Sequence, residues 1–286
     1  AAYKAVGESV EKPLDYFENN LFSLINLLKC VKDFSIPNFV FSSSCTVYGN
    51  PDSIPVTEET PVKKAESPYG ATKQMGEDII QEFARACNSK CILLRYFNPV
   101  GAHPSNFIGE LPLGRPQNLV PAITQTAIGK LPQMIVYGDD YDTRDGSCLR
   151  DFIHVSDIAH AHTLALEYLI NNKNQQNCEV FNLGTGNGVT VLEAIKTFEV
   201  VSGQKLNYKI GPRRPGIHST GSCGILRGRP GLELWLGLTC QATPSAWLVG
   251  FCRADRRPHM RQDDERTGWR DHGFQIRLEH PLPHRR

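Results

Sequence analysis

The chain has 286 residues, 40 % hydrophobic and 21 % charged, which is enough for one large or two modest domains with a substantial core. A formal net charge of +1 argues against a nucleic-acid or membrane-surface role for the whole chain, and no apolar run approaches the roughly 20 residues of a membrane span. The nine cysteines are scattered and form no CxxC pair, which is typical of a soluble protein in a reducing cytosol.

The first part of the chain alternates between helical and strand patterns. Apolar residues recur every three or four positions over 9–34, which predicts an amphipathic helix with Pro13 near its first turn. The short apolar runs at 38–45 and 91–98 indicate buried strands, and a helix over about 68–86 is predicted between them. Helix, strand, helix and strand at this spacing predict an α/β protein with a parallel sheet.

Beyond residue 98 the pattern loosens. The Gly, Pro and Asn content of 98–118 predicts a long loop, and loops of this length in compact domains are usually functional. Further elements are predicted as helices at about 118–130, 155–171 and 190–203 and as strands at 134–138, 149–155 and 179–184. After residue 216 the periodicity dissolves into Gly, Arg, Pro and His, so no element is predicted there.

The composition changes in the last quarter of the chain. Residues 1–216 contain 13 Lys and 7 Arg, whereas 217–286 contain no Lys, 11 Arg and all three Trp. This shift indicates a divergent tail that is disordered or read out of frame, or alternatively a genuine Arg-rich extension. A nucleic-acid arm is disfavoured, because 11 Arg against 7 acidic residues leave only +4 over 70 residues.

A candidate catalytic site begins in the stretch SPYGATK, where Tyr69 precedes Lys73 by four residues and would share a helix face with it. A phenol titrates near pH 10, so it acts as a base at neutral pH only if a neighbour such as this lysine stabilises its anion. Ser44 and Thr46, at the end of the predicted strand, could relay a substrate proton. The Tyr–Lys pair alone could equally be a solvated helix face.

Six motifs then follow in a recognisable order: SSSCTVYG, SPYGATK, LRYFNPVGAHP, LRDFIHV, FNLGTGNG and GPRRPG. Through them, residues 1–216 closely resemble the UDP-glucose 4-epimerases of the extended short-chain dehydrogenase family. The resemblance implies a partial Rossmann-like, doubly wound parallel sheet without its first strands, because roughly 80 family residues with the Gly-rich phosphate turn would precede this sequence. Residues 1–98 would be the C-terminal part of the NAD-binding domain, and 99–216 would be mainly a UDP-sugar-binding region with some elements returning to the sheet.

The resemblance also implies a reaction, the interconversion of UDP-glucose and UDP-galactose. Bound NAD takes a hydride from C4 of the sugar, and the hydride returns to the other face of the 4-keto intermediate. Tyr69 would be the base, Ser44 with Thr46 beside it would bridge Tyr69 to the sugar 4-hydroxyl, and Lys73 would bind the nicotinamide ribose and lower the pKa of Tyr69. Relatives of this kind tend to be homodimers.

Other positions match residues that contact the two ligands in the family. The further cofactor positions are Lys4, Asn19 and Phe97, and the positions that hold the UDP moiety are Asn98, Asn118, Leu119, Tyr137, Arg150 and Arg214. Two arginines suit a diphosphate, and an aromatic ring can stack on uracil. Several of these positions also have plain structural interpretations, since Asn19 could satisfy helix backbone, Asn98 could be a turn residue, and Phe97 and Tyr137 could be core residues.

The glycines of FNLGTGNG superficially resemble a dinucleotide fingerprint. Gly184, Gly186 and Gly188 follow a GxGxG spacing rather than GxGxxG, so we interpret them as a tight strand-to-helix turn in the substrate-binding part. The histidines His103, His154 and His160 show no spacing typical of a metal site, and no metal is expected.

Two alternatives stay open. Sugar-nucleotide 4,6-dehydratases of the same family carry an acidic pair after the equivalent threonine, where this chain has Val47 and Tyr48. The second alternative is a non-catalytic epimerase remnant or binding module, because Ile217 stands where the family expects an acidic residue after GPRRPG.

Overall fold

The structure is a computed structural model that describes residues 2–103, 105, 107–110, 112, 114–186 and 188–213. All of them belong to one compact unit of the chain. Arg214, one of the predicted UDP-binding residues, and the predicted tail 217–286 lie outside the described residues. Among the described helices, none combines the length and the apolar character needed to cross a bilayer.

The N-terminal helical segment consists of two helices, α1 (Val6–Glu11) and α2 (Pro13–Asp33), so the prediction of one helix over 9–34 was wrong at its start. Lys12 separates the two helices with φ −127° and ψ 58°. A residue that precedes proline is disfavoured in the helical region, because the proline ring crowds its backbone. Pro13 therefore ends one helix and begins the next, since its missing N–H costs nothing in a first turn.

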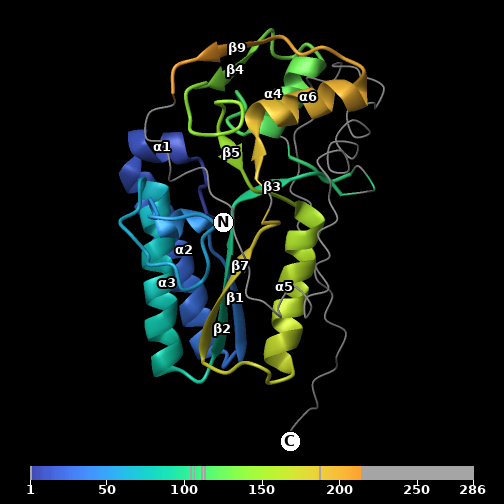
Figure 1. The fold of residues 1–286 in the computed structure, drawn as a ribbon. Helices are drawn as coiled ribbons and strands as arrows, with labels where there is room; N and C mark the ends of the chain where they lie inside the picture. Colours follow the sequence, from blue (N-terminus) through green and yellow to red (C-terminus); the bar gives the residue numbers. More distant parts are fainter. Residues whose placement is uncertain are drawn as a thin grey trace, which may run out of the picture. The chain divides into compact units, whose positions relative to one another are not determined.

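A three-stranded parallel sheet forms the centre of the fold, in the order β1 (Asn38–Ser42), β2 (Lys90–Tyr96) and β7 (Cys178–Leu183). Helices α2 and α3 (Pro68–Ala86) pack on one face of this sheet, and α5 (Val155–Ile170) packs on the other (Figure 1). This arrangement confirms the predicted α/β fold with a parallel sheet.

Alternation along β2 explains how the strand fills two cores. Leu93 and Cys91 belong to the cluster with Leu24 and Ile80 from α2 and α3, whereas the intervening Ile92 belongs to the cluster under α5. Successive side chains of a strand point to opposite faces, so a strand covered on both faces reads as a continuous apolar run. This alternation also places Arg95 on the face that α3 covers.

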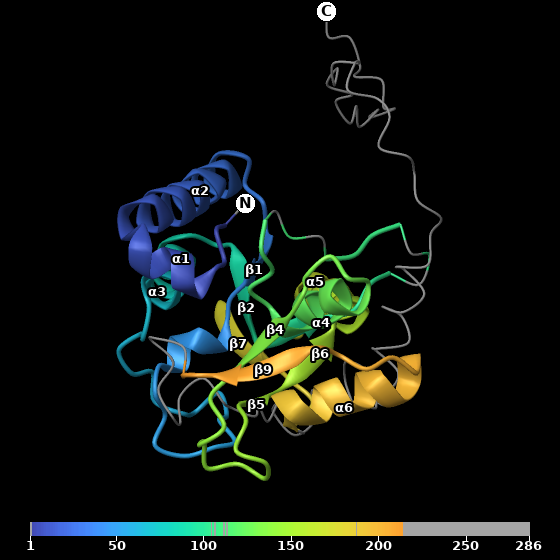
Figure 2. The same cartoon turned by 90° about the horizontal axis from the view of Figure 1, so that it is seen from above.

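A second group of elements lies beyond the carboxyl ends of these strands (Figures 1 and 2). It contains three two-stranded pairings, with helices α4 (Leu119–Ala127) and α6 (Val191–Ser202) packed on a shared core. The parallel pairs join β3 (Asn98–Val100) to β6 (Phe152–His154) and β4 (Met134–Tyr137) to β9 (Tyr208–Gly211). The antiparallel pair joins β5 (Leu149–Arg150) to β8 (Val189–Thr190).

Three sequence predictions need correction in this group. The predicted strand 91–98 ends at Tyr96, because Asn98 begins β3 and pairs with Phe152 in another sheet. The predicted strand 149–155 divides into β5 and β6 around Asp151, whose side chain is fully buried. No strand was predicted over Tyr208–Gly211, and it forms through parallel pairing with β4, a long-range contact that a local pattern does not record.

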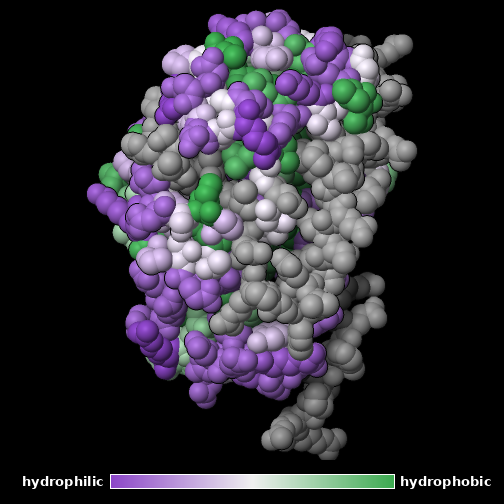
Figure 3. Space-filling model, viewed as in Figure 1, coloured by the Kyte–Doolittle hydropathy of each residue, from purple (hydrophilic) through white to green (hydrophobic). Residues whose placement is uncertain are grey.

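The surface of the face shown in Figure 3 is mainly hydrophilic among its coloured residues, and apolar residues occur there as small patches. Several apolar side chains of α2 are nevertheless strongly exposed, including Leu14 at 78 %, Phe22 at 59 % and Leu27 at 56 %. The face of the same helix that carries Leu24 and Leu28 is buried against the sheet.

Candidate active site

Tyr69 lies in the first turn of α3, and Ser44 lies in the loop that leaves β1. Helix α3 begins as the sequence predicts, with the Ser67 side chain accepting a hydrogen bond from the Gly70 backbone N–H and with Pro68 in the first turn. Ser44 caps the short 3-10 helix η1 (Cys45–Tyr48) and is buried. The structure brings the two predicted residues together, because the Ser44 side chain lies near enough to the Tyr69 phenol to lower its pKa.

Lys73 lies one turn further along α3 and is also buried. Its Nζ donates to the backbone carbonyl of Ser42 at 2.8 Å and lies 5.9 Å from the centroid of the Tyr69 ring and 4.8 Å from that of Phe41. Burial lowers the pKa of the Lys73 ammonium to about 8, while the Glu77 carboxylate acts in the opposite direction. Lys73 is thus a desolvated cation beside the phenol.

The predicted lowering of the Tyr69 pKa by Lys73 is not seen in this structure. Burial raises the pKa of the Tyr69 phenol instead, and the nearby Ser44 side chain only opposes that rise. The physical reason is that the Lys73 ammonium turns to the carbonyl of Ser42. In this arrangement Tyr69 holds its proton at neutral pH.

The Thr46 hydroxyl, in the loop that carries Ser44, is a polar group without a hydrogen-bond partner among the described residues. Its Oγ1 is buried. The Lys73 ammonium has three N–H donors, and Ser42 O is its one acceptor in the described part of the chain. Buried polar groups are nearly always satisfied, so an unpartnered buried hydroxyl and an ammonium with unused donors fit a ligand that carries hydroxyl groups.

Three charged or polar side chains that the sequence analysis did not select lie directly beneath the site. Glu77 and Arg95 form a buried ion pair, and Ser43 donates to the same carboxylate. Two signals in the sequence could have found them. Glu77 follows Lys73 at the spacing that places both on one helix face, and Arg95 interrupts an apolar strand on its α3-facing side.

The other predicted cofactor residues lie at different distances from Tyr69. Phe97 packs against the buried cluster that contains Cys45 and Tyr48, so it borders the Ser44 loop. Asn19, on α2, donates to the side chain of Asn20. Lys4 is exposed and forms an ion pair with Glu110 at 3.2 Å.

The predicted UDP-binding residues spread over the second group of elements. Arg150 acts electrostatically on the thiol of Cys45, which follows Ser44, and its Nη1 donates to Cys148 Sγ at 2.8 Å and to the backbone carbonyl of Leu149 at 3.0 Å. Asn98 donates to the backbone carbonyl of Asp151 at 3.2 Å, and Asn118 donates to Glu110 at 2.6 Å. Glu110 therefore joins a predicted cofactor residue, Lys4, to a predicted substrate residue.

Two further predicted residues lie farther out. Leu119 packs on the core under α4, and Tyr137 is 37 % exposed at the end of β4.

The Gly-rich turn after β7 is not a phosphate cradle in this structure. The Asp151 carboxylate accepts hydrogen bonds from the backbone N–H groups of Thr185 and Gly186 at 3.0 and 3.2 Å and from the Thr185 hydroxyl at 2.7 Å. These N–H groups are therefore already paired with an internal anion. The turn links a strand to the short β8 and α6, in agreement with the interpretation of its GxGxG spacing.

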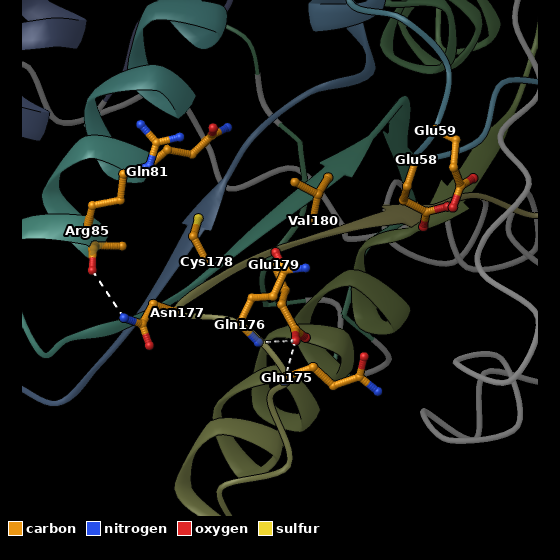
Figure 4. Close-up of a pocket in the computed structure, with 11 residues that line it drawn as sticks. Glu58, Glu59, Gln81, Arg85, Gln175, Gln176, Asn177, Cys178, Glu179 and Val180 are labelled. Atoms are coloured by element: carbon orange, nitrogen blue, oxygen red, sulfur yellow. Dashed lines mark hydrogen bonds between the residues drawn. The ribbon is translucent and has the colours of Figure 1, made fainter.

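A cavity of about 470 Å³ lies away from Tyr69, along β7 and the second half of α3 (Figure 4). Its lining is mainly polar and includes Glu58, Arg85 and Glu179. Glu179 is committed to the loop beside it, since it accepts from the backbone N–H groups of Gln175 and Gln176. None of the predicted site residues lines this cavity, so size alone does not locate the chemistry.

A family model described as the NAD dependent epimerase/dehydratase family matches residues 1–184. The chain belongs to this family. Among proteins of the epimerase/dehydratase family, UDP-glucose 4-epimerase 2 of Arabidopsis thaliana is 52 % identical over 217 residues, which are 76 % of this chain and 61 % of the relative. UDP-glucose 4-epimerase of Pasteurella multocida is 49 % identical over 221 residues, 77 % of this chain and 64 % of the relative. The chain thus spans less than two thirds of the length of these relatives.

Solved structures of the epimerase/dehydratase family share the fold. UDP-glucose 4-epimerase from Bifidobacterium longum, in complex with NAD+ and UDP, aligns with a TM-score of 0.80 at 43 % identity, over 87 % of this chain and 72 % of that one. The enzyme from Stenotrophomonas maltophila, with bound NAD and formylated UDP-arabinopyranose, aligns with a TM-score of 0.79 at 41 % identity, over 89 % and 76 %.

Proposed function

We propose that this chain carries the proton-transfer centre of a UDP-glucose 4-epimerase, an isomerase that interconverts UDP-glucose and UDP-galactose. The observation that carries the proposal is the convergence of three residues: the buried Ser44 acts on the Tyr69 phenol, and the buried ammonium of Lys73 lies 5.9 Å from the Tyr69 ring. Relatives at about half identity are named UDP-glucose 4-epimerases, which favours this reaction over that of the sugar-nucleotide 4,6-dehydratases.

NAD is the cofactor that we propose, and the site residues fit it. Lys73 would hold the hydroxyls of the nicotinamide ribose through its two remaining N–H donors, and a bound ligand would give the Thr46 hydroxyl the partner that it lacks. When bound, NAD supplies the hydride chemistry at C4 of the sugar. Phe97, which borders the Ser44 loop, would limit the access of water to this end of the site.

Tyr69 and Ser44 would move the proton of the sugar 4-hydroxyl. Ser44 lies between the loop backbone and Tyr69, so its Oγ can accept the substrate proton as it donates its own to Tyr69 Oη. Because burial raises the pKa of Tyr69, the phenolate forms only if a positive charge supports it. Lys73 is the cation near Tyr69. Because Lys73 is buried, water screens its charge only weakly, so it acts more strongly on the phenol.

The UDP moiety would be held by the second group of elements. We propose Arg150, Asn98, Asn118, Leu119 and Tyr137 for this role, with Arg214 outside the described residues. Support is strongest for Arg150, which acts electrostatically on Cys45 beside Ser44, since arginine suits a diphosphate.

The organisation of the chain that we propose follows from these roles. Residues 1–98 would serve the cofactor and 99–216 mainly the UDP-sugar, while α5 and β7 return to the sheet. A homodimer is also proposed for the full-length protein, in the cytosol. Exposed apolar side chains of α2, such as Leu14 and Phe22, support a helix contact between subunits.

A product assay tests the proposal. The purified chain is given UDP-galactose and NAD, and the sugar nucleotides are followed by proton NMR. UDP-glucose is the expected product, and Tyr69→Phe should lower its rate by on the order of 100-fold or more. Tyr208→Phe on β9 serves as the matched control and should keep the rate of the parent chain.

Two outcomes would overturn the proposal. Exclusive formation of a 4-keto-6-deoxy sugar nucleotide would assign the chain to the dehydratases. An unchanged rate in Tyr69→Phe would remove Tyr69 from the chemistry.

A further inference from the structure

Buried polar side chains form a layer at the carboxyl ends of all three strands of the central sheet. Arg95 on β2 and Asn182 on β7 are register partners, and Ser43 immediately follows β1. Glu77 reaches this layer from α3. The exposed fractions of Glu77 and Arg95 are only 3 % and 5 %. Arg95 binds Glu77 in bidentate fashion, with Nε to Oε1 at 2.9 Å and Nη2 to Oε2 at 2.5 Å.

This layer holds the Ser44 loop at both of its ends. The Ser43 hydroxyl donates to Glu77 Oε1 at 2.5 Å, directly before Ser44. At the other end, the Tyr48 ring lies under the Arg95 guanidinium, with 4.8 Å from Cζ to the ring centroid. The Tyr48 hydroxyl donates to Asn182 Oδ1 at 2.7 Å. The loop that carries Ser44 is therefore tied through Glu77 to the helix that carries Tyr69.

Glu77 also lies one turn beyond Lys73 on the same face of α3, where its carboxylate opposes the cost of burying the Lys73 ammonium. Phe41 and Ser42 of β1 bring no charge to Lys73. Cys45 in η1, Tyr16 on α2 and Tyr96 on β2 act electrostatically on Tyr69. Glu77 and Arg95 act on Cys178 of β7, and Arg95 also acts on Tyr48 of η1. Burial raises the pKa values of Tyr69, Cys45 and Tyr16, which keeps these three groups neutral near pH 7. The Glu77–Arg95 pair supplies the fixed charge near Lys73.

Stability does not explain why this pair is buried. Taking two charges out of water costs about as much as their attraction returns, and apolar replacements of similar volume are often neutral or stabilising. The Glu77–Arg95 pair lies beneath Tyr69, Ser44 and Lys73. Glu77 binds Ser43, which precedes Ser44, and Arg95 contacts Tyr48 at the other end of the Ser44 loop.

We propose that Glu77 is a positioning residue of this site, which fixes the Ser44 loop through Ser43 and keeps Lys73 protonated. The inference rests on the proposed function for its biological meaning. Its physical content, the charge of Lys73, can be measured without cofactor, substrate or turnover. Arg95 has the supporting role of holding the Glu77 carboxylate in its ionised form and in one orientation.

The test is a pH titration of the Lys73 side chain by NMR of its ¹³Cε and ¹⁵Nζ nuclei in the whole chain, with the signal assigned by Lys73→Arg. The parent chain should titrate near pH 8. Glu77→Gln should lower the midpoint by on the order of one pH unit, because it removes an opposite charge and leaves Arg95 unopposed. Glu82→Gln is the matched control on the same helix, since Glu82 is exposed, and it should leave the midpoint unchanged.

A second variant covers the case in which Glu77→Gln does not fold. The double variant Glu77→Gln/Arg95→Gln removes both charges and should lower the midpoint by less than the single variant does. Lys73 midpoints equal to that of the parent in the folded variants would overturn the proposal. A lowered midpoint in a chain that forms no UDP-glucose would uphold the electrostatic role and count against the proposed function alone.

Discussion

Replacing Lys73 by methionine should stabilise the folded chain at neutral pH, although it removes a residue that we place in the active site. Burial lowers the pKa of Lys73 by about 2.5, from 10.5 to about 8. A folded-state pKa below the unfolded one means that the unfolded chain binds more protons between pH 8 and pH 10.5. The free energy of unfolding therefore rises with pH across this window, and the destabilisation by Lys73 is complete below pH 8.

The size of the effect follows from the same pKa difference. At about 1.4 kcal/mol per pKa unit, the buried ammonium costs on the order of 3 kcal/mol at pH 7. The lost hydrogen bond to Ser42 O returns about 1 kcal/mol of that in the variant. We expect Lys73→Met to be more stable than the parent chain by about 2 kcal/mol at pH 7, in a 92 % buried position where solvent screening is weak.

Urea unfolding of parent and variant at several pH values measures this effect. The difference between them should shrink as the pH rises from 8 to 10.5, because Lys73 loses its charge there in the folded parent. Taking the difference removes the shared contribution of the buried cysteines, whose raised pKa values weaken the fold at alkaline pH. Lys29→Met, at an exposed position of α2, is the control. A variant less stable than the parent at pH 7 would refute this account of Lys73.

Three further predictions concern buried groups outside the proton-transfer centre. Asp151→Asn should lower the free energy of unfolding by about 1 to 3 kcal/mol in urea titrations, because the turn after β7 loses a charged acceptor for its N–H groups. Arg95→Met should cost about 3 to 5 kcal/mol by leaving Glu77 buried and unpaired, and adding Glu77→Gln should recover most of that loss; no recovery would contradict the pairing. Iodoacetamide labelling followed by mass spectrometry should modify the exposed Cys30 well before the buried Cys45 and Cys91, because burial raises the pKa values of both buried thiols; early labelling of Cys91 would show that β2 is accessible.

Local patterns predicted the individual elements of this chain well where the segment is long or buried. Helix α3 begins and ends at the predicted residues, because a Ser cap and a first-turn Pro mark its start. Strands β1, β2 and β7 follow from apolar runs that only a sheet covered on both faces can bury. The prediction failed where strand pairing depends on distant segments. At Asp151 the chain passes from β5, which pairs with β8, to β6, which pairs with β3, and the unpredicted β9 forms by pairing with β4.

The same division applies to the candidate site. Spacing alone placed Tyr69 and Lys73 on one helix face and Ser44 at the end of a strand, because helix and strand periodicities are local properties of the backbone. Tertiary packing decided which groups the Lys73 ammonium and the Tyr69 phenol contact. It turned the Lys73 ammonium to Ser42 O and raised the pKa of Tyr69 by desolvation, and both depend on neighbours distant in sequence.

The sequence by itself determined which residues could take part in catalysis and how the helices and central strands are patterned. Only the tertiary structure decided that Glu77, Arg95 and Ser43 meet beneath the candidate catalytic residues, since their contact joins a helix, a strand and a loop. The physical reason is that periodicity is set by the local backbone, whereas the energy of a buried charge is set by everything packed around it.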